Sequence, residues 1–406
     1  MVFTKFKNTV LLFVIVFLSC IDSKTVGDRF DTTQDPEQKP ITVGANRTDI
    51  YLPLLQGKKV GIVANQTSVI FGDAGKQTHV VDSLVALDVN LKKVFAPEHG
   101  FRGKADAGEL VKDGIDTKTN LPIVSLYGKN KKPSAKQLDD LDVVIFDIQD
   151  VGARFYTYIS SLHYVMEACA ELDIPMIILD RPNPNGHYVD DPILEKAHQS
   201  FVGMHPIPIV HGMTIGEYAN MINGQGWLKD GIKCHITVIH MKDYWHNKSY
   251  SIPIKPSPNL PNDISINLYP SLCFFEGTNV SAGRGTQTQF QIFGSPDLNK
   301  DHYSYSFTPE SNEGAKYPKH QGELCYGSDL RQEAPLTSIH LDWLIEAYKH
   351  TADRSTFFND FFSKLAGTSS LREQIEAGLS AEEIYASWQT GLDSFKEIRK
   401  TYLLYN

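Results

Sequence analysis

The chain has 406 residues, 41% hydrophobic and 21% charged, so it is long enough for two domains and too apolar to be disordered. Its formal net charge is −9, and no block of basic residues offsets this acidity, which excludes a nucleic acid partner. Aromatic residues make up 11% of the chain, a content that suits both core packing and surfaces that stack on sugars.

The first twenty residues are typical of a bacterial export signal. Lys5 and Lys7 precede an apolar run over 10–18, which is too short to span a membrane. Ser19 directly before Cys20 resembles a lipoprotein cleavage site, with Phe17 where Leu is usual. An ordinary secretion signal with an incidental cysteine is the alternative interpretation.

We therefore expect a signal peptide over 1–20, a lipid on Cys20 and a polar, flexible tether over 21–45. The protein would be exported to the bacterial cell envelope and contact a membrane only through this lipid anchor, in the periplasm or at the outer membrane.

The N-terminal half alternates between strand and helix patterns. The expected strands are 59–64, 91–96, 121–126, 143–146 and 175–179, and the expected helices are 80–87 and 160–172. This order is typical of an α/β fold. We predict a Rossmann-like, open and mostly parallel sheet with helices on both faces, over 46–255.

The second half has a different texture. A segment rich in Pro and Asn over 251–269 is expected to be an ordered loop, followed by helices over 336–348 and 380–400. The second helix begins with the capping box Ser380-x-x-Glu383, and 402–405 could form a final strand. We predict a smaller α+β C-terminal domain over 256–406 that completes the cleft.

No cofactor is expected. The sequence contains no GxGxxG after the first strand and no phosphate-binding loop, which argues against a nucleotide. The cysteines other than Cys20 are far apart, and the histidines show no HExxH or similar spacing. We therefore expect no metal and no redox pair.

Seven ordered blocks are the most specific feature of the sequence. They are VGIVANQT (60–67), FAPEHGFRG (95–103), DVGARFYTY (150–158), LDRPNP (179–184), VHGMTIGE (210–217), PSPNLP (256–261) and FEGTNVSAGRGT (275–286). Together they resemble the NamZ family of exo-β-N-acetylmuramidases. The resemblance implies removal of terminal non-reducing N-acetylmuramic acid from peptidoglycan fragments, either muropeptides or MurNAc-GlcNAc oligosaccharides, in a cleft between two domains.

Glycoside hydrolysis usually needs an acid for the leaving oxygen and a second carboxylate as nucleophile or base. Glu98 follows a predicted strand in a rigid Pro-Glu-His-Gly turn, and it matches the family's proposed catalytic residue. A helix cap or an ion pair with Arg102 is the alternative role. His99 could orient Glu98, bind sugar hydroxyls or be structural.

The second carboxylate is open between several candidates. Glu276 and Asp147 rank first, Asp150 follows, and Asp180 is a further strand-end residue whose neighbour Arg181 offers a structural ion pair.

Residues that would bind the sugar come from the same blocks. The lactyl carboxylate of muramic acid calls for an arginine fork, whereas a structural ion pair is the equal alternative for each candidate. Tyr156 could stack on the ring or fill the core, and the asparagines suit sugar hydroxyls or turns equally well. The binding candidates are Arg102, Arg154, Arg181, Arg284, Asn65, Asn259, Asn279, Asp150 and Tyr156. A non-catalytic glycan-binding surface lipoprotein remains the alternative function.

Overall fold

The computed structural model describes residues 39–102 and 113–405. The expected signal peptide, Cys20 and most of the expected tether lie outside the described residues. Within the described part, the helices are α1 (Thr48–Leu55), α2 (Val80–Ala86), α3 (Ala135–Leu138), α4 (Tyr158–Glu171), α5 (Ile215–Gly224), α6 (Asp263–Leu272), α7 (Asp342–Lys349), α8 (Phe362–Ala366), α9 (Ser370–Glu376) and α10 (Ala381–Lys400).

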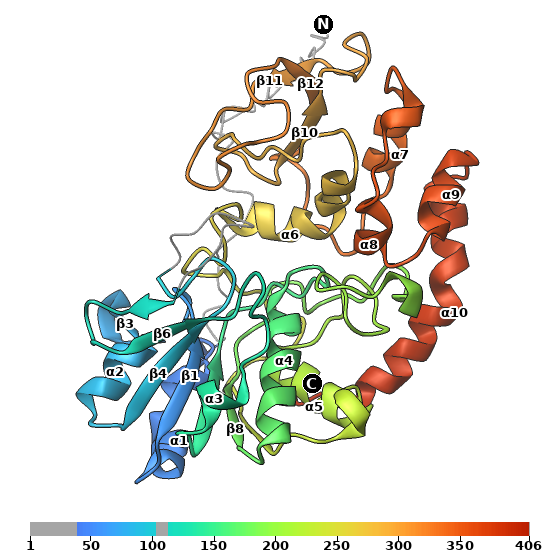
Figure 1. Cartoon of the computed structure of the whole chain (residues 1–406). Helices are drawn as coiled ribbons and strands as arrows, with labels where there is room; N and C mark the ends of the chain where they lie inside the picture. Colours follow the sequence, from blue (N-terminus) through green and yellow to red (C-terminus); the bar gives the residue numbers. More distant parts are fainter. Residues whose placement is uncertain (1–38, 103–112, 406) are drawn as a thin grey trace, which may run out of the picture. The chain divides into compact units, whose positions relative to one another are not determined.

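The described strands form three sheets (Figure 1). The largest has the order β5-β6-β4-β1-β7-β8-β9, and all its neighbouring strands are parallel except β5 and β6. Its strands are β1 (Val60–Ala64), β4 (Leu91–Ala96), β5 (Gly114–Ile115), β6 (Pro122–Ser125), β7 (Val143–Asp147), β8 (Met176–Leu179) and β9 (Ile236–Ile239). The predicted open, mostly parallel α/β sheet is confirmed.

Both faces of this sheet are buried, which explains why its central strands read as continuous apolar runs. In β7, Val144 and Phe146 point into the core formed with α3, α4 and α5, whereas Val143 and Ile145 point into the core formed with α1 and α2. This alternation follows the two-residue period of a strand. Helices therefore cover both faces, as predicted.

The C-terminal region, residues 263–405, contains a three-stranded antiparallel sheet and helices α6 to α10. Its strands are β10 (Ile292–Ser295), β11 (Tyr305–Phe307) and β12 (Cys325–Asp329), in the order β10-β12-β11. The core on the α4 face of the large sheet continues into this region without a break. Helix α10 runs back to the large sheet region (Figure 1), where Arg399 donates a hydrogen bond to the Gly212 carbonyl.

Three expectations about local structure differ from the structure. The segment 251–269 is not loop throughout, because Asn262 caps α6 through a reciprocal contact with Ser265. Residues 402–405 form no strand, and the Tyr405 hydroxyl instead donates a hydrogen bond to Asp180. Packing also begins before residue 45, since Val43 is buried and Thr42 pairs with Lys242.

Two further strands, β2 (Val69–Phe71) and β3 (Gln77–His79), form a hairpin beside the large sheet. None of the described helices combines the length and the hydropathy that crossing a bilayer requires.

Candidate active site

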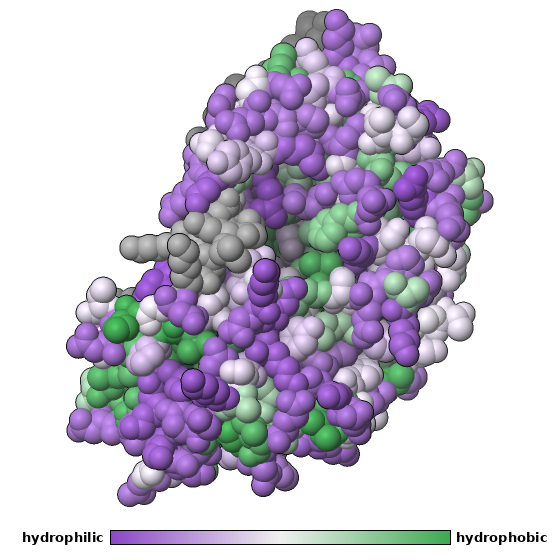
Figure 2. Space-filling view, viewed as in Figure 1, coloured by the Kyte–Doolittle hydropathy of each residue, from purple (hydrophilic) through white to green (hydrophobic). Residues whose placement is uncertain are grey.

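A cavity of about 240 Å³ lies where the large sheet region meets the C-terminal region, and we call it the central cavity. The surface of the molecule is hollowed at this boundary (Figure 2). Its polar lining includes two glutamates and one arginine, Glu98, Glu276 and Arg284, together with His99, Tyr127, Thr157, Ser257 and Asn259. Its apolar lining includes Phe155, Tyr156, Phe201, Val202, Leu260, Tyr269, Phe290, Phe361 and Leu365.

Glu98 reaches the cavity from the turn that follows β4. The turn closes by a 3.0 Å hydrogen bond from the Gly100 amide to the Pro97 carbonyl. His99 and Gly100 both have positive φ values, 68° and 76°, and this conformation is unusual for a residue other than glycine. The strained turn sets the direction of Glu98, and backbone strain of this kind is frequent at functional sites.

The Glu98 carboxylate contacts two hydroxyl groups. The Thr157 hydroxyl, at the start of α4, donates a 2.7 Å hydrogen bond to Glu98 Oε2. The Tyr127 hydroxyl lies against the same carboxylate, and burial together with the Glu98 charge raises the pKa of Tyr127. Neither hydroxyl was singled out in the sequence, because an isolated Thr or Tyr carries no local signal of its role.

Behind Glu98, Tyr156 and Tyr158 fix the loop that carries Pro256. The Tyr156 hydroxyl donates a 2.8 Å hydrogen bond to the Pro256 carbonyl, and the Tyr158 hydroxyl accepts a 2.9 Å hydrogen bond from Asn65 Nδ2. Tyr156 lines the cavity but is only 7% exposed. Asn65 is fully buried and bonded to Thr67 and Tyr158, so it supports the wall rather than facing the substrate.

Glu276 and Arg284 enter the cavity from the C-terminal region. Glu276 lies in the 3₁₀ turn η5 (Cys273–Gly277), and Arg284 Nε donates a 3.0 Å hydrogen bond to Glu276 Oε1. Both side chains keep about a quarter of their surface exposed, 27% and 24%. The pair is therefore accessible to a ligand in the cavity.

Lys319 braces the turn that carries Glu276. Its ammonium group donates hydrogen bonds to the carbonyls of Phe275, Thr278 and Val280, at 2.9, 2.6 and 2.9 Å. Burial lowers the pKa of Lys319. Sequence reasoning missed this residue because it lies outside the matched blocks and its contacts are with distant backbone atoms.

Asp147, ranked with Glu276 as a candidate for the second carboxylate, does not line the central cavity. Asp147 is fully buried at the end of β7, and both of its oxygens accept hydrogen bonds from Arg181, at 2.6 and 2.9 Å. Burial alone would lower the pKa of Arg181, but the Asp147 carboxylate offsets this effect and raises it. Two saturated partners in the core form a structural pair, which also removes Arg181 as a ligand for the lactyl group.

Arg154 and Arg102 are likewise occupied elsewhere. The fully buried Arg154 donates four hydrogen bonds to carbonyl oxygens, two of them on residues 192 and 207 and two on residues 365 and 366 of the C-terminal region. Arg102 is bound by Asp82 and Asp116. Of the four candidate arginines, all of which lie among the described residues, Arg284 alone lines the central cavity.

The remaining candidate residues also divide into those that line the central cavity and those that are bonded elsewhere. Asp150 is buried and accepts a 2.7 Å hydrogen bond from the Gly152 amide, and burial raises its pKa to about 7. Asp180 is bonded to Thr214 and Tyr405 in the core. Asn259 lines the cavity and donates to the Gly314 carbonyl, whereas Asn279 donates to Asp297. Of these residues, Asn259 is brought to the cavity.

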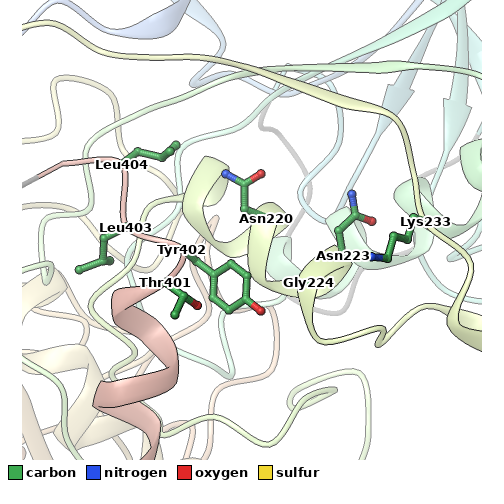
Figure 3. A pocket seen from close by; sticks show the side chains of 8 residues that line it. All are labelled: Asn220, Asn223, Gly224, Lys233, Thr401, Tyr402, Leu403 and Leu404. Carbon is green, nitrogen blue, oxygen red and sulfur yellow. The ribbon is translucent and has the colours of Figure 1, made fainter.

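Among the described residues, we also considered one surface depression and one cluster of possible metal ligands as functional sites. Neither has two carboxylates that face a cavity, as a glycoside hydrolase site requires. A depression of about 340 Å³ lies between α5 and the chain end at 401–404 (Figure 3), and Lys233 is its one charged lining residue. His302, Glu346 and His350 form a cluster whose nitrogen and oxygen atoms lie within 4.8 Å of one another. The two imidazole rings are stacked, with centroids 3.6 Å apart, so their ring nitrogens do not converge on one point.

Comparison with known proteins identifies relatives that cover most of the chain. A family model described as the N-terminal part of exo-β-N-acetylmuramidase NamZ matches residues 60–264, and its C-terminal counterpart matches residues 267–405. The peptidoglycan β-N-acetylmuramidase NamZ of Bacillus subtilis is 40% identical over 386 residues, covering 87% of this chain and 89% of that protein.

Two solved structures from Bacteroides fragilis, both of DUF1343 family proteins, share the fold. One is 46% identical with a TM-score of 0.82 and covers 91% of this chain and 99% of its own. The other is 28% identical with a TM-score of 0.74 and covers 90% and 99%.

Proposed function

The chain belongs to the NamZ family of exo-β-N-acetylmuramidases, and from this premise we propose that it removes terminal, β-1,4-linked N-acetylmuramic acid from the non-reducing end of peptidoglycan fragments. It is a glycoside hydrolase. The substrates are muropeptides or MurNAc-GlcNAc oligosaccharides released during cell-wall turnover. The observation that carries this function is the presence of two carboxylates, Glu98 and Glu276, in one cavity.

Glu98 is the residue that protonates the leaving oxygen. Its strained turn holds the carboxyl group at the cavity wall, and the hydroxyl of Thr157 fixes one of its oxygens. A positioned acid lowers the barrier to C–O cleavage because the departing alcohol need not leave as an alkoxide. In this role the protonated carboxyl group transfers its proton to the leaving oxygen as the C–O bond breaks.

Glu276 is the second carboxylate of the reaction, either as nucleophile toward the anomeric carbon or as base for a water molecule. Arg284 holds it from one side and also faces the cavity. The same guanidinium can therefore meet the lactyl carboxylate, which N-acetylmuramic acid has and N-acetylglucosamine lacks. Aromatic residues such as Tyr156 and Phe290 complete the wall around the sugar ring.

The test is the release of N-acetylmuramic acid from the non-reducing end of a MurNAc-GlcNAc disaccharide and from a chromogenic β-N-acetylmuramide. We expect turnover of both, no turnover by Glu276→Gln, and sugar binding retained by that variant. A wild-type protein that binds the disaccharide without cleaving it would instead be the glycan-binding lipoprotein. If Glu276→Gln raises only KM, Glu276 is a binding residue and not the second carboxylate.

We also propose that the protein is exported and anchored through a lipid on Cys20, in the periplasm or at the outer membrane. The support is the charged and apolar leader that ends at Ser19-Cys20. In bacteria that express the full chain, Cys20→Ala should move the protein from the membrane fraction to the soluble fraction. Unchanged membrane association would contradict the anchor.

A further inference from the structure

The central cavity shares its walls with two neighbouring cavities. One, of about 440 Å³, shares Glu276 and Arg284 with it, and we call this one the Tyr317 cavity. The other, of about 450 Å³, shares Ser257 with it. The two neighbours share Gly314. Because they share lining residues with the central cavity, both neighbouring cavities are candidate sites for the next sugar of a bound chain.

Tyr317 distinguishes the first of these cavities. Its side chain is 92% exposed, whereas the next most exposed large hydrophobic residue of the described chain, Ile115, is 67% exposed. A tyrosine ring offers a broad apolar face and a polar edge, which matches the C–H face and the hydroxyl groups of a pyranose. A single exposed aromatic residue is common on protein surfaces and does not by itself indicate a binding site. The structure around Tyr317 must therefore show whether it has this role.

The segment that carries Tyr317 is fixed on both sides. Before it, the Gly314 carbonyl accepts a 2.6 Å hydrogen bond from Asn259, which itself lines the central cavity. After it, Lys319 is held by three carbonyls of the segment around Glu276. Pro318 packs against Gly285, where an added Cβ would come within 2.6 Å of the proline ring. The exposed ring thus stands on a braced loop that lines one cavity together with Glu276 and Arg284.

A braced loop favours binding, since little backbone entropy is lost when a ligand stacks on an aromatic ring that the loop carries. We propose that the Tyr317 cavity binds the leaving sugar, with Tyr317 as the platform under the first N-acetylglucosamine residue after the scissile bond. This inference rests on the proposed muramidase function and adds a specificity-determining residue to it. The leaving sugar is uncharged, so its recognition depends on stacking rather than on ion pairing.

The experiment compares two substrates that differ only in the leaving group, a MurNAc-GlcNAc disaccharide and a methyl β-N-acetylmuramide. For Tyr317→Ala, kcat/KM should fall about three- to tenfold on the disaccharide, which is what loss of one aromatic contact corresponds to, and stay unchanged on the methyl glycoside. Tyr317→Phe should keep most of the activity on both substrates. Leu87→Ala, at another exposed side chain, is the matched control.

The outcomes separate this inference from the function on which it rests. Wild-type activity on neither substrate would overturn the muramidase function itself. Wild-type activity on both, with an equal loss or no loss in Tyr317→Ala, would leave the function intact and overturn the assignment of Tyr317. In that case the leaving sugar lies in the other neighbouring cavity, or beyond both.

Discussion

The pairs Asp147–Arg181 and Glu276–Arg284 have similar contact distances, 2.6 and 3.0 Å, but opposite surroundings. The first is sealed, with its side chains 0% and 1% exposed, whereas the second faces a cavity and is about one quarter exposed. A ligand in the cavity cannot reach the charged groups of the buried pair, because neither side chain is exposed. Two carboxylate–guanidinium pairs therefore differ in role: the sealed pair stabilises the fold, and the pair at the cavity is the one we propose for catalysis.

Several other candidate residues can be placed in the same two groups, according to whether their side chains are buried or line the central cavity. Arg154 and Asp150 are buried, as Asp147 and Arg181 are. We call these four residues the sealed charges. Glu98, Glu276 and Arg284 are the cavity charges. Replacing a cavity charge should change turnover and leave stability nearly intact, and replacing a sealed charge should do the reverse.

The largest effect is expected for Glu98→Gln. An amide has no acidic proton for the leaving oxygen, so kcat should fall about 10²–10⁴-fold while the melting temperature stays close to that of the wild type. Steady-state kinetics on a poorly activated glycoside and thermal unfolding are the measurements. The control is Glu323→Gln, at a carboxylate that is 63% exposed and lines none of the three cavities. Near-wild-type turnover in a folded Glu98→Gln variant would show that another group is the acid.

A large loss of stability is expected for Asp147→Asn. The substitution leaves Arg181 charged and buried without its carboxylate, and breaking a buried pair in this way costs about 3–5 kcal/mol. Urea unfolding measures the cost. Arg331→Gln, which removes an exposed pair with Asp329, is the control and should cost less than about 1 kcal/mol. Equal stability of the two variants would contradict the sealed assignment.

How far the sequence predicts this arrangement depends on the kind of feature. Apolar runs such as 143–146 identify the sheet, because strands buried on both faces have a strong pattern. The same reasoning correctly places Asp147 at a strand end but does not tell whether its side chain meets a cavity or Arg181. The partner lies 34 residues away, and such pairing is set by tertiary packing. Short strands such as β11, with three residues, carry too little periodicity to be predicted.

Specificity provides a smaller and sharper contrast. A charge-assisted hydrogen bond to the lactyl carboxylate contributes about 1.5–3 kcal/mol, so Arg284→Met should lower the preference for an N-acetylmuramide over the matching N-acetylglucosaminide about 10–150-fold. The ratio of the two kcat/KM values is the measurement, because any damage to Glu276 affects both substrates. Arg102→Met is the control, since Arg102 has comparable exposure but is bound by two aspartates. A preference that survives Arg284→Met would place the recognition in backbone amides or cavity shape.

The smallest effect concerns two buried groups, Asp150 and His211, whose pKa values are shifted in opposite directions. Asp150 Oδ2 lies 3.9 Å from His211 Nε2. Burial raises the pKa of Asp150 to about 7 and lowers the pKa of His211 to about 3. Folding therefore takes up a proton at Asp150 between about pH 4 and 7, which makes stability fall as the pH rises. At His211 the unfolded chain binds the extra proton between about pH 3 and 6.5, which makes stability rise with pH.

In the wild type these two contributions oppose each other, so their sum changes little over this range. Asp150→Asn leaves the His211 contribution, and its free energy of unfolding should rise relative to the wild type by about 1–2 kcal/mol from pH 4.5 to pH 6.5. His211→Gln leaves the Asp150 contribution, so the relative change should have the opposite sign. Urea titrations at the two pH values measure both. Relative changes of the same sign in the two variants would show that Asp150 or His211 is not buried as described. If that group is Asp150, the division between sealed and cavity charges fails at this residue.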